Sequence, residues 1–264
     1  MSTTHIRYDI ADGVATITLN RPQVMNAFGD DMRETLYHRL REAADDRHVR
    51  CVVITGAGKA FCAGGDIANM ASLQDKGEAG EIRQRMLTGG EIVKLIHGMA
   101  KPVIAAVNGA AAGAGMNLAL ACDFRYACAS AKFAQSFVKI GLVPDWAGHY
   151  LLPRLVGTAR AMELMMTGER IDAEEALRLG IVNRVYPDES FREAVAQRVR
   201  LFADGPPDTL ALIKQGVQRG VGASLPETLA FELQAQSAVF LSADAREGMR
   251  AFLEKRTPRF GGEE

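Results

Sequence analysis

Neither sign of charge is in excess in this chain, because 31 Lys and Arg residues stand against 32 Asp and Glu residues, giving a formal net charge of −1. Proteins that bind nucleic acid usually carry a basic excess clustered on one face. The N-terminal segment MSTTHIRYDIADG also lacks the apolar run of a secretory signal. We therefore expect a cytoplasmic protein with neither a nucleic acid nor a membrane as partner.

Cysteine is scarce, and its spacing fits no metal site. The four cysteines are Cys51, Cys62, Cys122 and Cys128, and no pair forms a CxxC or zinc-finger pattern. We expect buried free thiols in a reducing setting and no bound metal. Cys62 lies in a glycine-rich loop, but the neighbouring residues offer no base that would activate it.

One uncharged stretch of 21 residues, Pro102–Cys122, is long enough to span a bilayer. Two asparagines, Asn108 and Asn117, and three glycines interrupt it. Its first part is typical of a buried strand and its last part of a helix. We therefore interpret it as a buried strand–loop–helix unit.

Strand and helix patterns alternate through the first 185 residues or so, and helical patterns alone follow. Short apolar strands are predicted at Cys51–Thr55 and Val103–Val107, and a helix at Trp146–Leu155. Such alternation indicates an α/β fold with parallel strands. We divide the chain into a core of residues 1–200 and a helical C-terminal region of residues 201–264, which needs its own core or a neighbouring subunit to pack on.

Two loops of small residues each join a predicted strand to a predicted helix. The first is Phe61–Asp66, and the second is Gly109–Gly115. Small residues let backbone N–H groups approach a ligand, and amides at a helix N-terminus have no partner inside the helix. Two such loops facing each other would form an oxyanion hole. The alternative is that the residues are small only for packing. P-loop and dinucleotide-binding patterns are both absent.

Taken together, the loops resemble the crotonase (enoyl-CoA hydratase/isomerase) superfamily. The strings that carry the resemblance are AFCAGGDI and KPVIAAVNGAAAGAG, supported by NRPQVMNAF, ACDFRYACASAKF, TGERIDAEEALRLGIVNRV and REGMRAFLEKRTPRF. They cover nearly the whole chain in order. The resemblance implies a crotonase-like ββα spiral core, a helical C-terminal trimerisation region, and an acyl-CoA thioester as substrate. It implies a homotrimer or a dimer of trimers, and no cofactor other than the CoA of the substrate.

The resemblance also implies roles for individual residues. The amides of Gly65 and Ala114 would hold the thioester oxygen. The resemblance places Ala63, Asp66 and Ile67 near CoA. It also implies that Phe252 and Lys255 can reach the CoA bound by a neighbouring subunit. Asp66 has an alternative role as the cap of the helix that begins at Ile67.

Both glutamates that hydratases of this superfamily use to add water are replaced here. Their positions are occupied by Asn117 and Phe137, and neither can activate water. Asn117 would bind substrate or pack within its helix. We therefore expect a reaction other than standard hydration.

One carboxylate, Asp145, lies where isomerases of the superfamily carry an aspartate. The surrounding string LVPDWAGHYLLPRLVG is most similar to ring-1,2-epoxyphenylacetyl-CoA isomerases. Apolar neighbours would raise its pKa toward a useful range for a base. Asp145 has an alternative role as a helix N-cap.

We therefore expect an enoyl-CoA double-bond isomerase with a single aspartate base. Three alternatives remain open: a hydratase-like lyase with other acid and base residues, an aryl-CoA dehalogenase or hydrolase, and an acyl-CoA binder without catalysis. A dehalogenase would need a histidine near Gly89 and a tryptophan at Phe137. His97 and His149 are the candidate histidines nearby.

Overall fold

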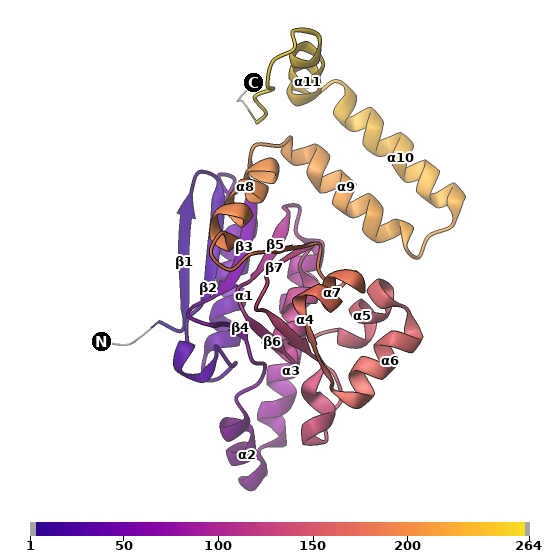
Figure 1. Cartoon of the computed structure of the whole chain (residues 1–264). Coiled ribbons are helices and arrows are strands. Elements are labelled where there is room, and N and C mark those ends of the chain that lie inside the picture. Colours follow the sequence, from indigo (N-terminus) through magenta and orange to yellow (C-terminus); the bar gives the residue numbers. More distant parts are fainter. Residues whose placement is uncertain (1–3, 262–264) are drawn as a thin grey trace.

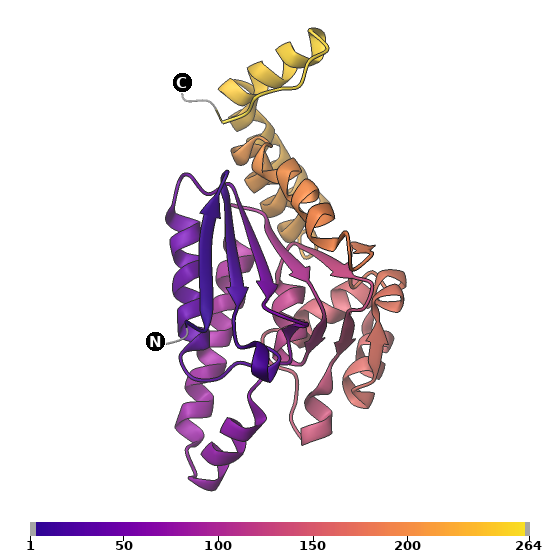
Figure 2. The same ribbon diagram turned by 60° about the vertical axis from the view of Figure 1, so that its left-hand side comes forward.

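The computed structural model describes residues 4–261 and contains two sheets. The first has the order β1-β2-β3-β5-β7-β10, with β1 antiparallel to β2 and the others parallel. Its strands are Ile6–Ala11, Val14–Leu19, Cys51–Gly56, Val103–Val107, Phe124–Cys128 and Arg184–Tyr186. The sheet fans out in Figure 2, with strongly buried central strands. The predicted parallel α/β arrangement is confirmed.

The second sheet is small and has the order β4-β6-β8-β9. Its strands are Ala60–Cys62, Ala110–Ala112, Lys132–Ala134 and Arg170–Asp172. The chain passes from a strand of the large sheet to one of the small sheet through tight corners at Gly56 and Gly109. A Cβ at either glycine would lie 2.1 Å from a carbonyl oxygen of the neighbouring segment. These corners allow the repeated strand–strand–helix order of the spiral.

The sequence patterns did not predict β4 and β6, because both are three-residue strands inside the small-residue loops. Alanine is a poor strand former on its own. These segments become strands because parallel pairing, Ala60 with Ala110 and Cys62 with Ala111, satisfies their backbone groups. Each small-residue loop is therefore fixed to the other by a sheet.

Besides the sheets, the described part of the core contains eight α-helices and two short 3-10 helices. The α-helices are α1 Met32–Asp45, α2 Ile67–Asp75, α3 Ala79–Gly98, α4 Ala114–Ala121, α5 Gly148–Val156, α6 Thr158–Thr167, α7 Ala173–Arg178 and α8 Phe191–Ala203, and the 3-10 helices are η1 Pro22–Val24 and η2 Ser136–Ile140. The central helix α4 is buried along its whole length. Within residues 4–261, every helix is too short or too polar to cross a lipid bilayer.

Three further helices form an arm that projects from the core (Figure 1). They are α9 Pro207–Gly220, α10 Leu225–Phe240 and α11 Ala243–Leu253. Helices α9 and α10 lie side by side as a hairpin. Residues 204–206 separate α8 from α9, and residues 221–224 separate α9 from α10.

Candidate active site

A cavity of about 180 Å³ lies between the two small-residue loops, η2, the segment before α5, and helices α1 to α3. Six of the predicted site residues line it: Ala63, Gly65, Ile67, Ala114, Phe137 and Asp145. A larger hollow of about 600 Å³, bordered by Thr55, Asn108 and Asp188, contains none of them. The cavity between the loops is therefore the candidate active site.

The two small-residue loops interlock at the floor of the cavity. A Cβ on Gly64 would lie 3.5 Å from the amide nitrogen of Ala114 and 2.8 Å from the Ala112 carbonyl oxygen. A Cβ on Gly115 would lie 2.2 Å from the Cys62 carbonyl oxygen. Side chains at these glycines would push the loops apart, so the small residues serve close approach as well as packing.

Gly65 and Ala114 both lie at this junction and both line the cavity. Gly65 forms an isolated parallel bridge with Phe28, in which Gly64 supplies the carbonyl and Asp66 supplies the amide. The Gly65 amide is left facing the other side. Ala114 is the first residue of α4, where a helical amide has no acceptor within the helix. The positive end of the α4 dipole adds to the attraction for negative charge.

Asp145 is the sole carboxyl group among the cavity-lining residues of the described chain, residues 4–261. Burial raises its pKa to about 6, and the positive charge of Arg33 opposes that shift. Its Oδ1 atom is buried and has no hydrogen-bond partner within residues 4–261. A carboxylate with this pKa is largely ionised at neutral pH yet weakly solvated, which suits a general base.

Asp145 does not cap a helix, because α5 begins at Gly148 with Ala147 as its N-cap residue and no side-chain cap. The helix starts later than expected because Trp146 and Ala147 both have left-handed backbone conformations, with φ of 45° and 57°. This unusual turn directs the Asp145 side chain toward the cavity. The N-cap alternative for Asp145 is therefore wrong.

The indole of Trp146 forms the wall beside Asp145. It stacks on Phe28 with ring centroids 4.7 Å apart. On its other side lies Gly89 of α3, where a Cβ would come within 2.5 Å of the indole nitrogen. The absence of a side chain at Gly89 thus leaves room for the Trp146 ring.

Arg33, in the first turn of α1, lines the same cavity and was not identified from the sequence. Only 6% of its surface is exposed, and its guanidinium lies 5.3 Å from the centre of the Phe28 ring. Burial lowers its pKa, as does the nearby charge of Arg85. The sequence held one indication that Arg33 is buried, because Arg33 lies three residues before the apolar Leu36 and therefore on the same face of α1.

Asn117 is fully buried and does not line the cavity. Its Nδ2 donates to the Asp145 carbonyl oxygen at 2.8 Å, and its Oδ1 accepts from Gln135 Nε2 at 2.7 Å. Both partners of the Asn117 side chain lie outside α4, so these contacts differ from the packing within its helix that was considered. The amide therefore holds the backbone of Asp145 in place.

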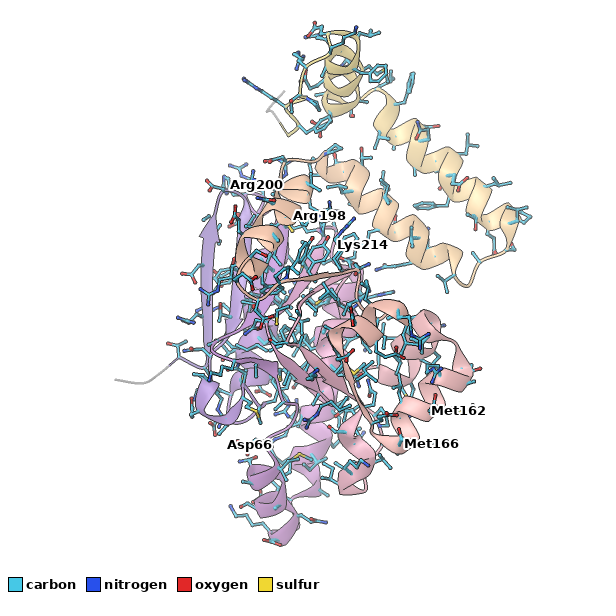
Figure 3. The ribbon with its side chains drawn as sticks, viewed as in Figure 1. Asp66, Met162, Met166, Arg198, Arg200 and Lys214 are labelled. Carbon is cyan, nitrogen blue, oxygen red and sulfur yellow. The ribbon has the colours of Figure 1, made fainter. Side chains whose placement is uncertain are left out.

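Asp66 lies where the chain enters α2 (Figure 3). Its side chain accepts a hydrogen bond from the Asn69 amide at 3.3 Å and pairs with Arg21 at 3.1 Å. The capping role considered for Asp66 is confirmed. The neighbouring Ala63 and Ile67 line the cavity without such engagements.

Phe252 and Lys255 lie at the end of the arm, exposed and outside the cavity of their own chain. Phe252 is 82% exposed. A contact with CoA would therefore have to involve a neighbouring subunit, as the resemblance implies.

The cysteines and histidines provide no competing chemistry. All four cysteines are buried, free thiols, and burial raises the pKa of Cys62 to about 12. Within residues 4–261, no cluster of three potential metal ligands occurs. His97 packs edge-on against Tyr150, and His149 is exposed.

Comparisons with known proteins identify the family of this chain. A family model described as enoyl-CoA hydratase/isomerase matches residues 9–263. The chain belongs to the enoyl-CoA hydratase/isomerase family. Its backbone is similar to a crystal structure of an enoyl-CoA hydratase from Bacillus anthracis, with a TM-score of 0.93, 35% identity, and coverage of 98% of this chain and 100% of that one.

Relatives within the family have names that differ in the reaction. A probable enoyl-CoA hydratase of Rhodobacter capsulatus is 44% identical over 99% of this chain and 100% of its own. A 1,2-epoxyphenylacetyl-CoA isomerase of Escherichia coli is 41% identical over 96% of this chain and 97% of its own. Membership of the family thus leaves hydration and isomerisation to be decided by the site.

Proposed function

We propose that this family member is an enoyl-CoA isomerase that moves a double bond with Asp145 as its single base. The observation that supports it is the lone carboxyl group of Asp145 in a cavity that also contains the amides of Gly65 and Ala114. In this proposal the thioester oxygen of the acyl-CoA accepts hydrogen bonds from both amides.

The chemistry follows from these three groups. The Asp145 carboxylate takes a proton from C2 of a 3-enoyl thioester, and the electrons move onto the thioester oxygen as a dienolate. The two amides stabilise that negative charge, and one such donor contributes about 3–4 kcal/mol in a transition state. The protonated Asp145 then returns the proton to C4, which leaves a 2-enoyl thioester.

Burial of Asp145 supports both halves of this cycle. A pKa near 6 lets the group accept a proton at neutral pH and release it again. Phe137 and Trp146 line the same space and keep water from the dienolate. Turnover is expected to rise with pH through about 6, because the ionised form of Asp145 is the base.

A hydratase-like lyase is the second candidate, favoured by the name of the Rhodobacter relative. Against it, hydration needs a positioned water and an acid, and Asn117 and Phe137 replace the glutamates that would provide them. A dehalogenase with a histidine at the Gly89 position is disfavoured because any side chain there would overlap the Trp146 indole. An acyl-CoA binder without catalysis would leave the raised pKa of Asp145 without a use.

For assembly, we propose a homotrimer or a dimer of trimers in which Phe252 and Lys255 of one subunit contact CoA bound by the next. The apolar residues exposed along the arm support this assembly. The substrate itself brings the CoA, and the proposal includes no other cofactor.

The decisive experiment measures deuterium uptake at C2 of acyl-CoA thioesters in heavy water, together with product analysis on 3-enoyl- and 2-enoyl-CoA. Wild type should exchange C2 and convert the 3-enoyl to the 2-enoyl thioester. Asp145→Asn should lose about 100-fold or more of the isomerase turnover. Asp9→Asn, an exposed carboxylate on β1, serves as the matched control and should retain it.

Full isomerase turnover in Asp145→Asn would reject the assignment of the base. A 3-hydroxyacyl-CoA as the main product would favour the lyase. CoA binding without exchange would indicate a binder.

A further inference from the structure

Arg33 is a buried charge whose side chain makes no hydrogen bond within residues 4–261. Its Nη1 atom is inaccessible and has no partner in that part of the chain. A guanidinium presents five N–H donors, and leaving buried donors unpaired costs free energy. An acceptor on a bound ligand would offset that cost.

The position of Arg33 is fixed by its neighbours. Its guanidinium lies over the Phe28 ring, and Phe28 in turn stacks on Trp146. This stack places Arg33 on the same wall as Asp145, so it borders the acyl end of the cavity, where the proposed base acts. The Oδ1 of Asp145 is likewise unpaired, and no ion pair or hydrogen bond joins the two side chains in the described chain, residues 4–261.

The charges around Arg33 do not neutralise it. Arg85, which also lines the cavity, repels it, while Asp145 and Glu34 attract it. Arg85 has its own partners, Glu81 at 2.9 Å and Asn69 at 2.6 Å. Arg33 is therefore the cavity-lining cation whose guanidinium donors are not engaged by a side chain or backbone group of residues 4–261, and the donors other than the enclosed Nη1 are the ones that a ligand would meet.

We propose that Arg33 is a specificity-determining residue that donates hydrogen bonds to an oxygen atom carried by the acyl group of the substrate. The proposal rests on the proposed acyl-CoA function and narrows its substrate class. The preferred substrates are thioesters whose acyl group bears a hydroxyl, ether or carboxylate oxygen, rather than plain hydrocarbon chains. Arg33 holds that oxygen on the wall beside Asp145, which fixes the acyl chain for proton transfer.

The test is calorimetric titration of the full-length protein with saturated acyl-CoAs, which cannot isomerise. Hexanoyl-CoA is compared with 4-, 5- and 6-hydroxyhexanoyl-CoA and with adipoyl-CoA. Wild type should bind at least one oxygen-bearing ligand about 10-fold or more tightly than hexanoyl-CoA, as a hydrogen bond to a charged donor provides. The hydroxyl and carboxylate arms identify which oxygen is recognised.

Two variants separate recognition from electrostatics. Arg33→Met should bring the preference, measured as the ratio of the two affinities in the same variant, to within about 2-fold, and Arg33→Lys should retain part of it because one charged donor remains. Arg41→Met, an exposed arginine on the same helix, is the control and should retain the full preference.

The absence of any preference in wild type would overturn the proposal, and that result does not depend on whether a variant folds. An unchanged preference in Arg33→Met, with only the pH profile of turnover shifted, would also overturn it and leave Arg33 as a charge that tunes Asp145. Isomerisation of 3-hexenoyl-CoA is measured separately, so failure of the isomerase proposal is distinguishable from failure of this one.

Discussion

Apolar residues are buried in the core and exposed in the arm. In the core, residues such as Ile54, Phe61 and Leu118 are fully buried, and the site is built among them. In the arm, α9 and α10 have no buried residue at all. Figure 1 shows why, since the arm projects from the core and covers little of it. The core buries its apolar residues, whereas α9 and α10 leave theirs exposed within their own chain.

The exposed residues of the arm are arranged in stripes. Ile213, Val217 and Val221 recur every four residues, and so do Leu225, Leu229 and Leu233. Such spacing places each set on one face of a helix. Contiguous apolar surface of this kind marks an interaction site, which is the role that assembly would give it.

Breaking the contact between α9 of the arm and the core should give the largest change in the stability of the chain. Lys214 of α9 pairs with Asp123 at 2.7 Å and donates to the carbonyl oxygens of Ile96 and Lys101 (Figure 3). Lys214→Met removes the cation beside Asp123, whose carboxylate then keeps only the hydrogen bond from the Val103 amide, so it should lower the free energy of unfolding by about 3–5 kcal/mol. Lys94→Met, an exposed control, should change it by less than about 0.5 kcal/mol. Urea denaturation measures both, and equal midpoints would show that the contact contributes nothing.

Within the core, Asp145 should lower the free energy of unfolding at pH values at which its carboxyl group is ionised. Its pKa is raised from 3.8 to about 6, so the folded state binds the proton more tightly than the unfolded state does. Above pH 6 this costs at most about 3 kcal/mol, and below about pH 4 the cost disappears because both states are protonated. Asp145→Asn should therefore be more stable than wild type at pH 8 and similar to it at pH 4.

Denaturation curves at the two pH values test this prediction. Asp9→Asn should show less than about 0.5 kcal/mol of change at either pH, because Asp9 is exposed. A stability difference between Asp145→Asn and wild type that is independent of pH would contradict the assigned burial of the carboxylate.

The adjacent glycines of α3 offer a matched pair in the core. A Cβ on Gly89 meets the Trp146 indole, whereas a Cβ on Gly90 meets nothing within 4 Å. Gly89→Ala should destabilise the protein by about 1–3 kcal/mol through overpacking. Gly90→Ala should stabilise it by up to about 1 kcal/mol through helix propensity. Thermal unfolding measures the stability of both variants. Equal melting temperatures would contradict the placement of the Trp146 indole against Gly89.

A substitution in the arm should change the stability of the subunit least and its assembly most. Leu233 is 70% exposed, so Leu233→Ser removes little burial within the chain and should change subunit stability by less than about 0.5 kcal/mol. Sedimentation analysis should show a smaller assembly than wild type at equal concentration. Glu232→Ser, its exposed polar neighbour, is the control. An unchanged mass would exclude this stripe from the interface.

Much of the site was predictable from the sequence because its parts are local. The small residues of the two loops, the strand before each loop and the helix after it all lie within short segments, so their pattern indicated close-approaching amides. The missing hydratase glutamates and the remaining Asp145 were likewise visible position by position. Pairing of β4 with β6 was not, because three-residue strands have no periodicity of their own.

The α/β class, the family resemblance and the chemical types available to the site follow from the order of the amino acids. The use of those groups depends on how the folded chain brings them together. The tertiary structure assigned Asn117 to the backbone of Asp145 and Asp66 to a helix cap, and it brought Arg33 to the cavity. The physical reason is that burial, and with it the pKa of a carboxyl group and the satisfaction of a guanidinium, depends on neighbours that are distant in the chain.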